Sequence, residues 1–279
     1  MGRAKNPVKA VETTATILKK VAELDGAGVT ELSNHLDITK GTVHNHLTTL
    51  EENELVVKDG NRFRLGLRFF EFGEQIKNKH KIYEVGMPEV DKLAEETGEL
   101  GNILVEEHGR GIYLYRAEGE NALSLDTGIG SRVYLHQTGL GKAILAHMPR
   151  DRVEAIIDEH GLAPSTKHTV SSREELFDDL EQIREQGYAL DMEERAEGIR
   201  CVAAPVITND GTVRGAVSVA GPASRMRSEH LESTVSDMVM RAANVISINL
   251  SYSSFRPFCI AKRSVSHSLT VFETILLQY

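Results

Sequence analysis

Residues 29–65 read VTELSNHLDITKGTVHNHLTTLEENELVVKDGNRFRL, and this stretch decides the fold of the N-terminal part of the chain. Apolar residues recur at helical spacing over 30–36 and again over 40–52, with a turn at 37–39 between them. Residues 55–65 form two β-prone runs around Asp59-Gly60, the strongest short signal of a β-hairpin. The stretch therefore predicts two helices joined by a turn and followed by a hairpin.

Upstream of this stretch, apolar residues at every third or fourth position predict a first helix over 10–24, which Asp25-Gly26-Ala27-Gly28 ends. Three helices followed by a hairpin make a winged helix-turn-helix, which we assign to residues 8–67. Downstream, 67–79 has the pattern of another helix, and we assign 68–80 as a linker helix between two domains.

The rest of the chain predicts a second domain over 81–250. Its pattern predicts strands at 102–106, 111–117, 123–126, 200–207 and 212–220, and helices at 83–97, 140–147, 152–159, 172–186 and 229–250. Ser171 and Glu174 match a capping box for the helix at 172–186. This order predicts an α+β fold, an antiparallel sheet flanked by helices. Residues 251–279 break from the composition of the body, and we expect a poorly ordered, dispensable tail there.

Bulk properties narrow the class of protein. A chain of 279 residues exceeds the usual size of one hydrophobic core, which favours two domains. Its two cysteines, Cys201 and Cys259, have no metal or redox spacing, and the N-terminus lacks the apolar run of a secretory signal. No apolar run approaches the roughly 18 residues that span a bilayer. We therefore expect a soluble cytoplasmic protein.

The net charge of −9 argues against a nucleic-acid partner, but this average conceals an asymmetry. Residues 1–80 carry 12 Lys and Arg against 11 Asp and Glu, a net +1, whereas residues 81–250 carry 17 against 29, a net −12. Only the first segment can approach phosphates without strong repulsion. The charge distribution is therefore compatible with DNA binding by the helix-turn-helix, and not by the second domain.

The third helix and the wing carry the candidate DNA-reading residues. With Val43, Leu47 and Leu50 facing inward, the polar side chains of 40–52 face outward, as on a recognition helix. The Asn45 amide can pair with adenine, and two wing arginines can reach the backbone or minor groove. We predict contacts to double-stranded DNA from Thr39, Lys40, Thr42, His44, Asn45, His46, Thr48, Arg62 and Arg64. His44 and His46 point in different directions on a helix, so we expect no shared metal.

Four stretches of the second domain have the composition of a ligand pocket. Residues 135–143, LHQTGLGKA, place glycines at the start of a helix, where N–H groups and the dipole favour an anionic group. Residues 187–194, 198–205 and 215–222 place small polar side chains among apolar strand positions. Each stretch alone is compatible with turn chemistry and close packing, and together they favour a ligand site.

These residues carry a family resemblance. The chain from about Val8 to Leu250 resembles the IclR-type bacterial and archaeal transcription regulators, through the winged helix with Thr42-Val43-His44, through TGLGKAILA at 138–146, and through GYALDMEERAEGIRCVAAPV at 187–206. The resemblance implies a homodimer, often paired into a dimer of dimers, on palindromic operator DNA. It also implies a GAF/profilin-like effector domain that binds a small organic acid.

The resemblance also implies the positions of the effector pocket. A hydroxy-, keto- or sugar-derived acid would place its anionic end at the helix start, its polar centre on Ser218 and Cys201, and its hydroxyls on Asp191. The matching positions are Leu125, Val133, Gly139, Leu140, Asp191, Ile199, Cys201, Ser218 and Ala220. Ala220 departs from relatives that offer a hydroxyl there, and Asn45 stands where relatives commonly carry arginine.

Two alternatives remain open from the residues alone. A cysteine-dependent hydrolase would use Cys201 as nucleophile and His136 as base, although no third orienting group is evident. A winged helix can also serve as a protein-interaction module without an operator. We expect a regulator and not an enzyme, with no catalytic residue, cofactor or metal.

Overall fold

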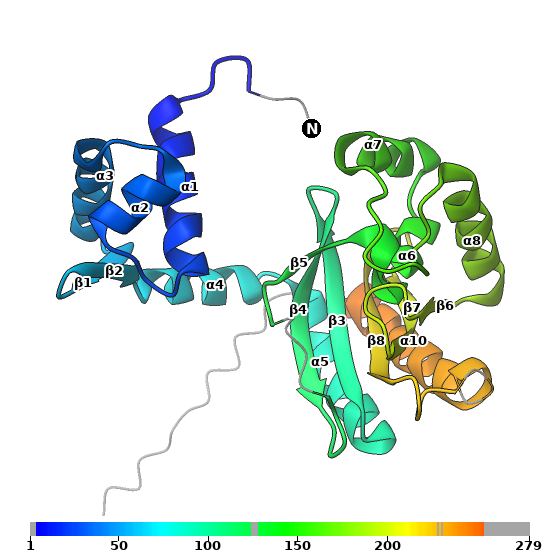
Figure 1. Cartoon of the computed structure of the whole chain (residues 1–279). Helices are drawn as coiled ribbons and strands as arrows, with labels where there is room; N and C mark the ends of the chain where they lie inside the picture. Colours follow the sequence, from blue (N-terminus) through cyan, green and yellow to red (C-terminus); the bar gives the residue numbers. More distant parts are fainter. Residues whose placement is uncertain (1–3, 124–127, 228, 230, 254–279) are drawn as a thin grey trace, which may run out of the picture.

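The computed structural model describes residues 4–123, 128–227, 229 and 231–253. Its N-terminal part holds helices α1 (Lys9–Glu23), α2 (Val29–Leu36) and α3 (Lys40–Glu52), followed by the antiparallel hairpin of β1 (Val56–Asp59) and β2 (Arg62–Leu65). This is the winged helix-turn-helix that the sequence predicts (Figure 1). The fold confirms the helix-turn-helix, and the ends of its three helices agree with those predicted from the apolar spacing to within about two residues.

A small hydrophobic core holds these elements together. Its buried side chains come from all three helices, from both strands and from the connection between α1 and α2, and they are Ile17, Val21, Ala27, Leu32, Val43, Leu47, Leu50, Val56 and Phe63. The wing is joined to the core by a backbone bridge, in which Ala27 and Phe63 exchange hydrogen bonds of 3.0 and 2.9 Å. This bridge fixes the wing relative to the connection between α1 and α2.

Helix α4 (Arg68–Lys77) leads from the wing toward the second part of the chain (Figure 1). None of its residues is buried, which sets it apart from the preceding helices. Helix α5 (Lys81–Thr97) follows and packs on the sheet of the second part, and Gly98 in the left-handed region ends it.

The second part is built on one antiparallel sheet of six strands in the order β5-β4-β3-β8-β7-β6. The strands are β3 (Leu100–Glu107), β4 (Arg110–Glu118), β5 (Arg132–Tyr134), β6 (Ala189–Met192), β7 (Ile199–Ile207) and β8 (Val213–Pro222). Because side chains alternate across a strand, consecutive residues of the central strands serve opposite faces of the sheet. The α+β fold class is therefore confirmed.

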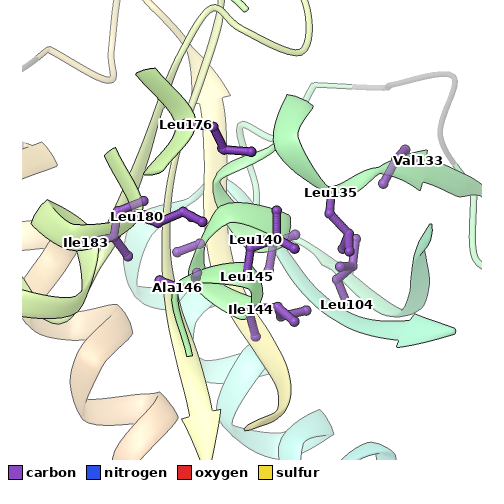
Figure 2. Close-up of a cluster of buried hydrophobic side chains, with 14 of the residues drawn as sticks. Leu104, Val133, Leu135, Leu140, Ile144, Leu145, Ala146, Leu176, Leu180 and Ile183 are labelled. Carbon is purple, nitrogen blue, oxygen red and sulfur yellow. The ribbon is translucent and has the colours of Figure 1, made fainter. Parts of the chain in front are cut away.

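Helices cover both faces of this sheet. One face packs against α6 (Gly139–Ala146), with the 3-10 turn η1 (Leu135–Gln137) leading into it. Side chains of α7 (Arg150–His160) and α8 (Arg173–Gln186) complete the hydrophobic layer around α6. Figure 2 shows the buried leucines and isoleucines of this layer around α6. The other face packs against α5 and α10 (Ser236–Ser253), which follows the π-helical turn η2 (Leu231–Val235). Within the described residues, no helix is long and apolar enough to cross a membrane.

Several local expectations differ from the structure. Strands β5 and β6 are additions to the predicted set, and the predicted strand at 123–126 lies mostly outside the described residues. Helix α8 is capped by Ser172, whose hydroxyl accepts from Glu175 N, one residue later than the predicted capping box. Residues 251–253 of the expected tail continue α10, and residues 254–279 lie outside the described part.

Candidate functional site

The N-terminal end of α3 presents a short polar surface. The Thr39 hydroxyl accepts from Thr42 N at 3.2 Å and caps the helix, so Thr39 serves the fold as well as the surface. Lys40, His44 and Asn45 are exposed. A cationic, an imidazole and an amide side chain therefore stand free at the end of the helix that the sequence assigns to base reading.

Two further α3 residues of the predicted set are engaged within the fold. His46 Nδ1 lies 2.8 Å from the Thr14 hydroxyl of α1, so this ring joins two helices. The Thr48 hydroxyl donates to the His44 carbonyl oxygen at 2.9 Å. The outward surface of α3 is consequently narrower than the helical pattern alone indicates.

The wing arginines have intramolecular partners. The Arg62 guanidinium donates to the Gly26 carbonyl oxygen and lies 3.4 Å from a Glu31 carboxylate oxygen. Arg64 lies 3.4 Å from Asp59 of the facing strand. Both side chains are about half exposed. Because Arg62 has two intramolecular partners and Arg64 has one, Arg64 is the more available of the two for a phosphate.

In the second part, a cavity of about 240 Å³ lies between the sheet and the start of α6. Its floor is a row of paired residues across four strands: Leu100 of β3, Ala220 of β8, Cys201 of β7 and Asp191 of β6. Because the register aligns these residues on one face, positions 120 apart in the sequence meet in one site.

A second row of the floor runs beside the first. Arg116 of β4, Asn102 of β3 and Ser218 of β8 are paired across the strands. The Arg116 Nε donates to Asn102 Oδ1 at 3.4 Å, and Asn102 Nδ2 in turn lies 3.4 Å from Ser218 Oγ. This row gives the cavity floor a line of hydrogen-bonding side chains.

The predicted effector residues divide between the cavity and its surroundings. Those that line the cavity are Leu140, Asp191, Ile199, Cys201, Ser218 and Ala220. Gly139 stands behind the lining, where a Cβ would lie 3.5 Å from the Asp191 Cβ. Val133 is part of the hydrophobic layer around α6, and Leu125 lies outside the described residues.

Sequence reasoning missed the residues on the other walls of the cavity. These are Leu100, Asn102, Tyr113, Arg116, Thr138, Arg195 and Ala196. One signal was available for Asn102, which is a polar residue directly before the apolar run Ile103-Leu104-Val105 of its strand. The structure buries it to 3 % exposure. Arg116 and Tyr113 become visible only through the pairing of β3 with β4.

Asp191 has an unusual electrostatic environment. It is buried, and its Oδ1 accepts hydrogen bonds from Glu194 N at 2.7 Å and Arg195 N at 3.3 Å. Burial, with a contribution from the Glu194 carboxylate, raises the pKa of Asp191 to about 7. Near neutral pH this side chain can therefore both accept and donate hydrogen bonds.

A buried ion cluster supports the wall beside Asp191. Lys142 of α6 donates to Glu194 at 2.7 Å and to Asp179 of α8 at 2.8 Å. Burial alone would lower the pKa of Lys142, but the two carboxylates outweigh it and raise the pKa. The cluster ties the connection between β6 and β7 to both helices.

The hydrolase alternative finds little support in this geometry. Burial raises the pKa of the Cys201 thiol well above its usual range, which disfavours a thiolate nucleophile. His136 Nε2 lies 3.0 Å from the Ala163 carbonyl oxygen, and burial lowers its pKa. In the described part of the chain, no cluster of three His, Cys, Asp or Glu side chains is arranged to hold a metal.

Comparisons with known proteins agree with this architecture. The IclR helix-turn-helix domain matches residues 10–60, and the bacterial transcriptional regulator IclR C-terminal domain matches residues 75–248. The chain is 33 % identical over 247 residues to the "Probable HTH-type transcriptional regulator ArcR" of Halobacterium salinarum, covering 87 % of this chain and 94 % of that protein. It is 34 % identical to the HTH-type transcriptional regulator KdgR of Escherichia coli, covering 87 % and 92 %.

A solved structure shows the same arrangement of domains. The crystal structure of the Thermotoga maritima IclR superposes with a TM-score of 0.70 at 28 % identity, covering 88 % of this chain and 98 % of that one. These relatives are named as regulators of transcription, not as enzymes. The chain therefore belongs to the IclR family of transcriptional regulators, with an N-terminal helix-turn-helix domain and a C-terminal effector domain.

Proposed function

We propose that this regulator binds a specific operator through α3 and the wing, and that a small hydroxylated organic acid in the cavity controls its affinity for DNA. The observation that carries the proposal is the cavity floor, where Asp191, Ser218 and Asn102 offer hydrogen bonds inside a mostly buried space. A concave site with a few convergent polar groups is typical of small-molecule recognition.

The DNA-reading part of the proposal rests on the exposed end of α3. Asn45 is the candidate for base recognition, because its amide can form two hydrogen bonds with adenine in the major groove. Lys40, Arg64 and Lys58 of the exposed wing strand are the candidates for phosphate contacts. We assign Arg62 a mainly structural role, because its guanidinium is held by Gly26 and Glu31.

Homodimer formation is supported by apolar side chains that lack a cover in the single chain. Leu67, Phe70 and Ile76 of the α4 region are 88 %, 69 % and 56 % exposed. Val8 and Val11 at the start of α1 are 62 % and 64 % exposed. Because no residue of α4 is buried, its large exposed apolar groups mark an interaction surface. A second copy of the chain, placed so that two α3 helices face DNA together, would cover them and read a palindromic site.

Ligand control follows from differential affinity. An acid that binds the cavity can shift the operator equilibrium only as far as it prefers one arrangement of the dimer, typically about 1–3 kcal/mol. The cavity lies beside α6 and the β6–β7 connection, which the Lys142 cluster holds to α8. We propose that occupancy alters this packing and that α5 and α4 carry the change to the helix-turn-helix.

The test combines operator selection with ligand titration. The full-length protein is used to select bound duplexes from a random library, and the affinity for the selected operator is then measured with and without a panel of hydroxy, keto and sugar acids. We expect an enriched palindrome and at least one acid that shifts the affinity several-fold. Ser218→Ala and Asp191→Asn should weaken the acid's effect while leaving operator binding without acid intact.

Two results would contradict the proposal. If the selection enriches no particular sequence, the protein has no specific operator, and the interaction-module alternative is favoured. An acid whose effect is the same in the wild type, in Ser218→Ala and in Asp191→Asn would place the effector outside this cavity.

A further inference from the structure

Arg62 is the first residue of β2, directly after the hairpin turn, and its guanidinium contacts the region where α2 begins. It donates to the Gly26 carbonyl oxygen, and its Nη1 lies 3.4 Å from Glu31 Oε2. The same Glu31 oxygen accepts from Gly28 N at 3.4 Å, across the first turn of α2. One carboxylate therefore joins the start of this helix to the wing through Arg62.

The backbone of the wing lies very close to the connection between α1 and α2. Ala27 and Phe63 exchange two backbone hydrogen bonds. A Cβ at Gly28 would lie only 3.1 Å from the Asn61 carbonyl oxygen, so glycine permits this close approach. These backbone contacts hold one edge of the hairpin, and Arg62 adds a side-chain contact beside them. The position of the wing relative to α2 therefore depends on both.

A groove of about 520 Å³ lies between α3 and the wing, and both Arg62 and Glu31 line it. His44 lines the groove from α3, and Lys58 lines it from the wing. Among the described residues that line this groove, Glu31 is the only acidic one. A DNA backbone in contact with both α3 and the wing would lie along the groove, where an unpaired carboxylate would repel its phosphates.

We infer that Arg62 is a positioning residue, which holds the wing on the start of α2 and screens the Glu31 carboxylate from the DNA backbone, and that it does not bind a phosphate itself. This inference rests on the proposed DNA binding by α3 and the wing. If Arg62 moved to a phosphate, it would leave Glu31 unpaired beside that phosphate, so one attraction would be gained and one repulsion created. Arg64 can leave Asp59, which is 64 % exposed, without this penalty.

The test is a double-mutant cycle on the full-length protein, with DNA affinity measured at several salt concentrations. The probe is a duplex of random sequence, because contacts to the DNA backbone carry no sequence information. The variants are Arg62→Ala, Glu31→Gln and the two combined, with Arg64→Ala for comparison. The matched controls are Arg214→Ala and Asp210→Asn, which break a similarly exposed pair in the β7–β8 hairpin, 3.1 Å apart.

We expect Arg62→Ala to lower the affinity on the order of ten-fold, because it loosens the wing and exposes the Glu31 charge. In the presence of Glu31→Gln the same change should cost no more than about three-fold, since no carboxylate is left to repel the phosphates. The slope of log affinity against log salt should keep its wild-type value in Arg62→Ala. Arg64→Ala should instead reduce that slope by about 0.9, the value of one phosphate contact. Both controls should bind as the wild type does.

The melting temperature of every variant is measured alongside its affinity, so that a change in folding is separated from a change in binding. If Arg62→Ala lowers the melting temperature by several degrees, Arg62→Gln takes its place in the cycle. The amide of this variant can still donate a hydrogen bond toward the Gly26 carbonyl oxygen, but it carries no charge to screen Glu31. The same reduction of the loss by Glu31→Gln, with an unchanged salt slope, is expected for it.

Two results overturn the inference and leave the proposed function intact. If Arg62→Ala reduces the salt slope as much as Arg64→Ala does, Arg62 binds a phosphate directly. If Arg62→Ala costs the same affinity with and without Glu31→Gln, the two side chains do not act together on DNA. A wild-type protein that binds no duplex at any salt concentration would instead contradict the proposed DNA binding, and this inference with it.

Discussion

The helix-turn-helix and the effector cavity place their polar residues in opposite physical settings. On α3 and the wing, Lys40, Asn45 and Arg64 stand in water at the surface, and they come from one continuous stretch of 26 residues, 39–64. In the cavity, Asn102, Asp191 and Ser218 are at most 3 % exposed and come from three strands. Surface polar groups can change at little cost to folding, whereas buried ones must keep their partners. Substitutions on α3 should therefore change DNA binding without changing stability, whereas substitutions around the cavity should change both ligand binding and stability.

The largest effect on stability is expected when the charge of Lys142 is removed. Lys142→Met keeps the apolar stem but leaves Glu194 and Asp179 without their buried cation, so we expect a loss of about 3–5 kcal/mol in the free energy of unfolding. Lys20→Met, which breaks an exposed pair with Glu23 in α1, should change stability by at most about 0.5 kcal/mol. Thermal and urea unfolding of the full chain measure both, and equal effects would show that the cavity wall is as tolerant as the surface.

The pH dependence of stability gives the next largest effect. The pKa of Asp191 is raised from 3.8 to about 7, so between these values the folded protein holds a proton that the unfolded chain has lost. Stability from this group is therefore present at low pH and is lost as pH rises from about 4 to 7, by up to roughly 4 kcal/mol. Asp191→Asn should remove this dependence, which appears as a smaller fall in melting temperature between pH 5 and pH 8.

Asp210 provides a control of opposite sign. Hydrogen bonds from Thr208 and Thr212 lower the pKa of this exposed carboxyl to about 2, so its contribution is present above about pH 4 and is lost as pH falls toward 2. Asp210→Asn should leave the pH 5 to pH 8 interval unchanged. A wild-type protein and an Asp191→Asn variant with identical pH profiles would mean that Asp191 is charged throughout.

The two regions also differ in how much the sequence alone could reveal. For the helix-turn-helix, the period of apolar residues and the Asp59-Gly60 signal predict all five elements, because their contacts are local. The cavity depends on strand register, which sequence patterns do not fix: Arg116 meets Asn102 only because β3 and β4 pair as they do. The resemblance supplied Asp191, Cys201 and Ser218, while Tyr113 and Arg195 needed the structure. Nor did the helical pattern show that His46 binds Thr14.

Substitutions on the DNA-reading surface should have a smaller effect, which changes the affinity for DNA and leaves the stability of the fold unchanged. Asn45→Ala should lose about 1–3 kcal/mol of discrimination at one base position. Arg64→Ala should instead weaken binding to all sequences alike and reduce the salt dependence by about one phosphate contact. Binding to a set of single-base operator variants at several salt concentrations measures both. A stability loss in Asn45→Ala, or equal losses at every base position, would contradict the assignment of this exposed residue to base reading.

The smallest effect is expected at the end of α10. Ser251 is the first residue of the expected tail, yet its hydroxyl accepts from Asn209 N at 3.1 Å in the β7–β8 hairpin and donates to the Ser247 carbonyl oxygen at 2.8 Å. A chain cut after Leu250 loses these bonds and should lose about 1 kcal/mol of stability. A chain cut after Ser253 keeps them and should match the full chain in melting temperature, operator affinity and oligomeric state. If the cut after Ser253 lowers the melting temperature by several degrees, residues 254–279 stabilise the folded protein and the expectation of a dispensable tail is wrong. Because the two cuts differ by three residues, their comparison separates the contribution of the last turn of α10 from that of everything beyond it.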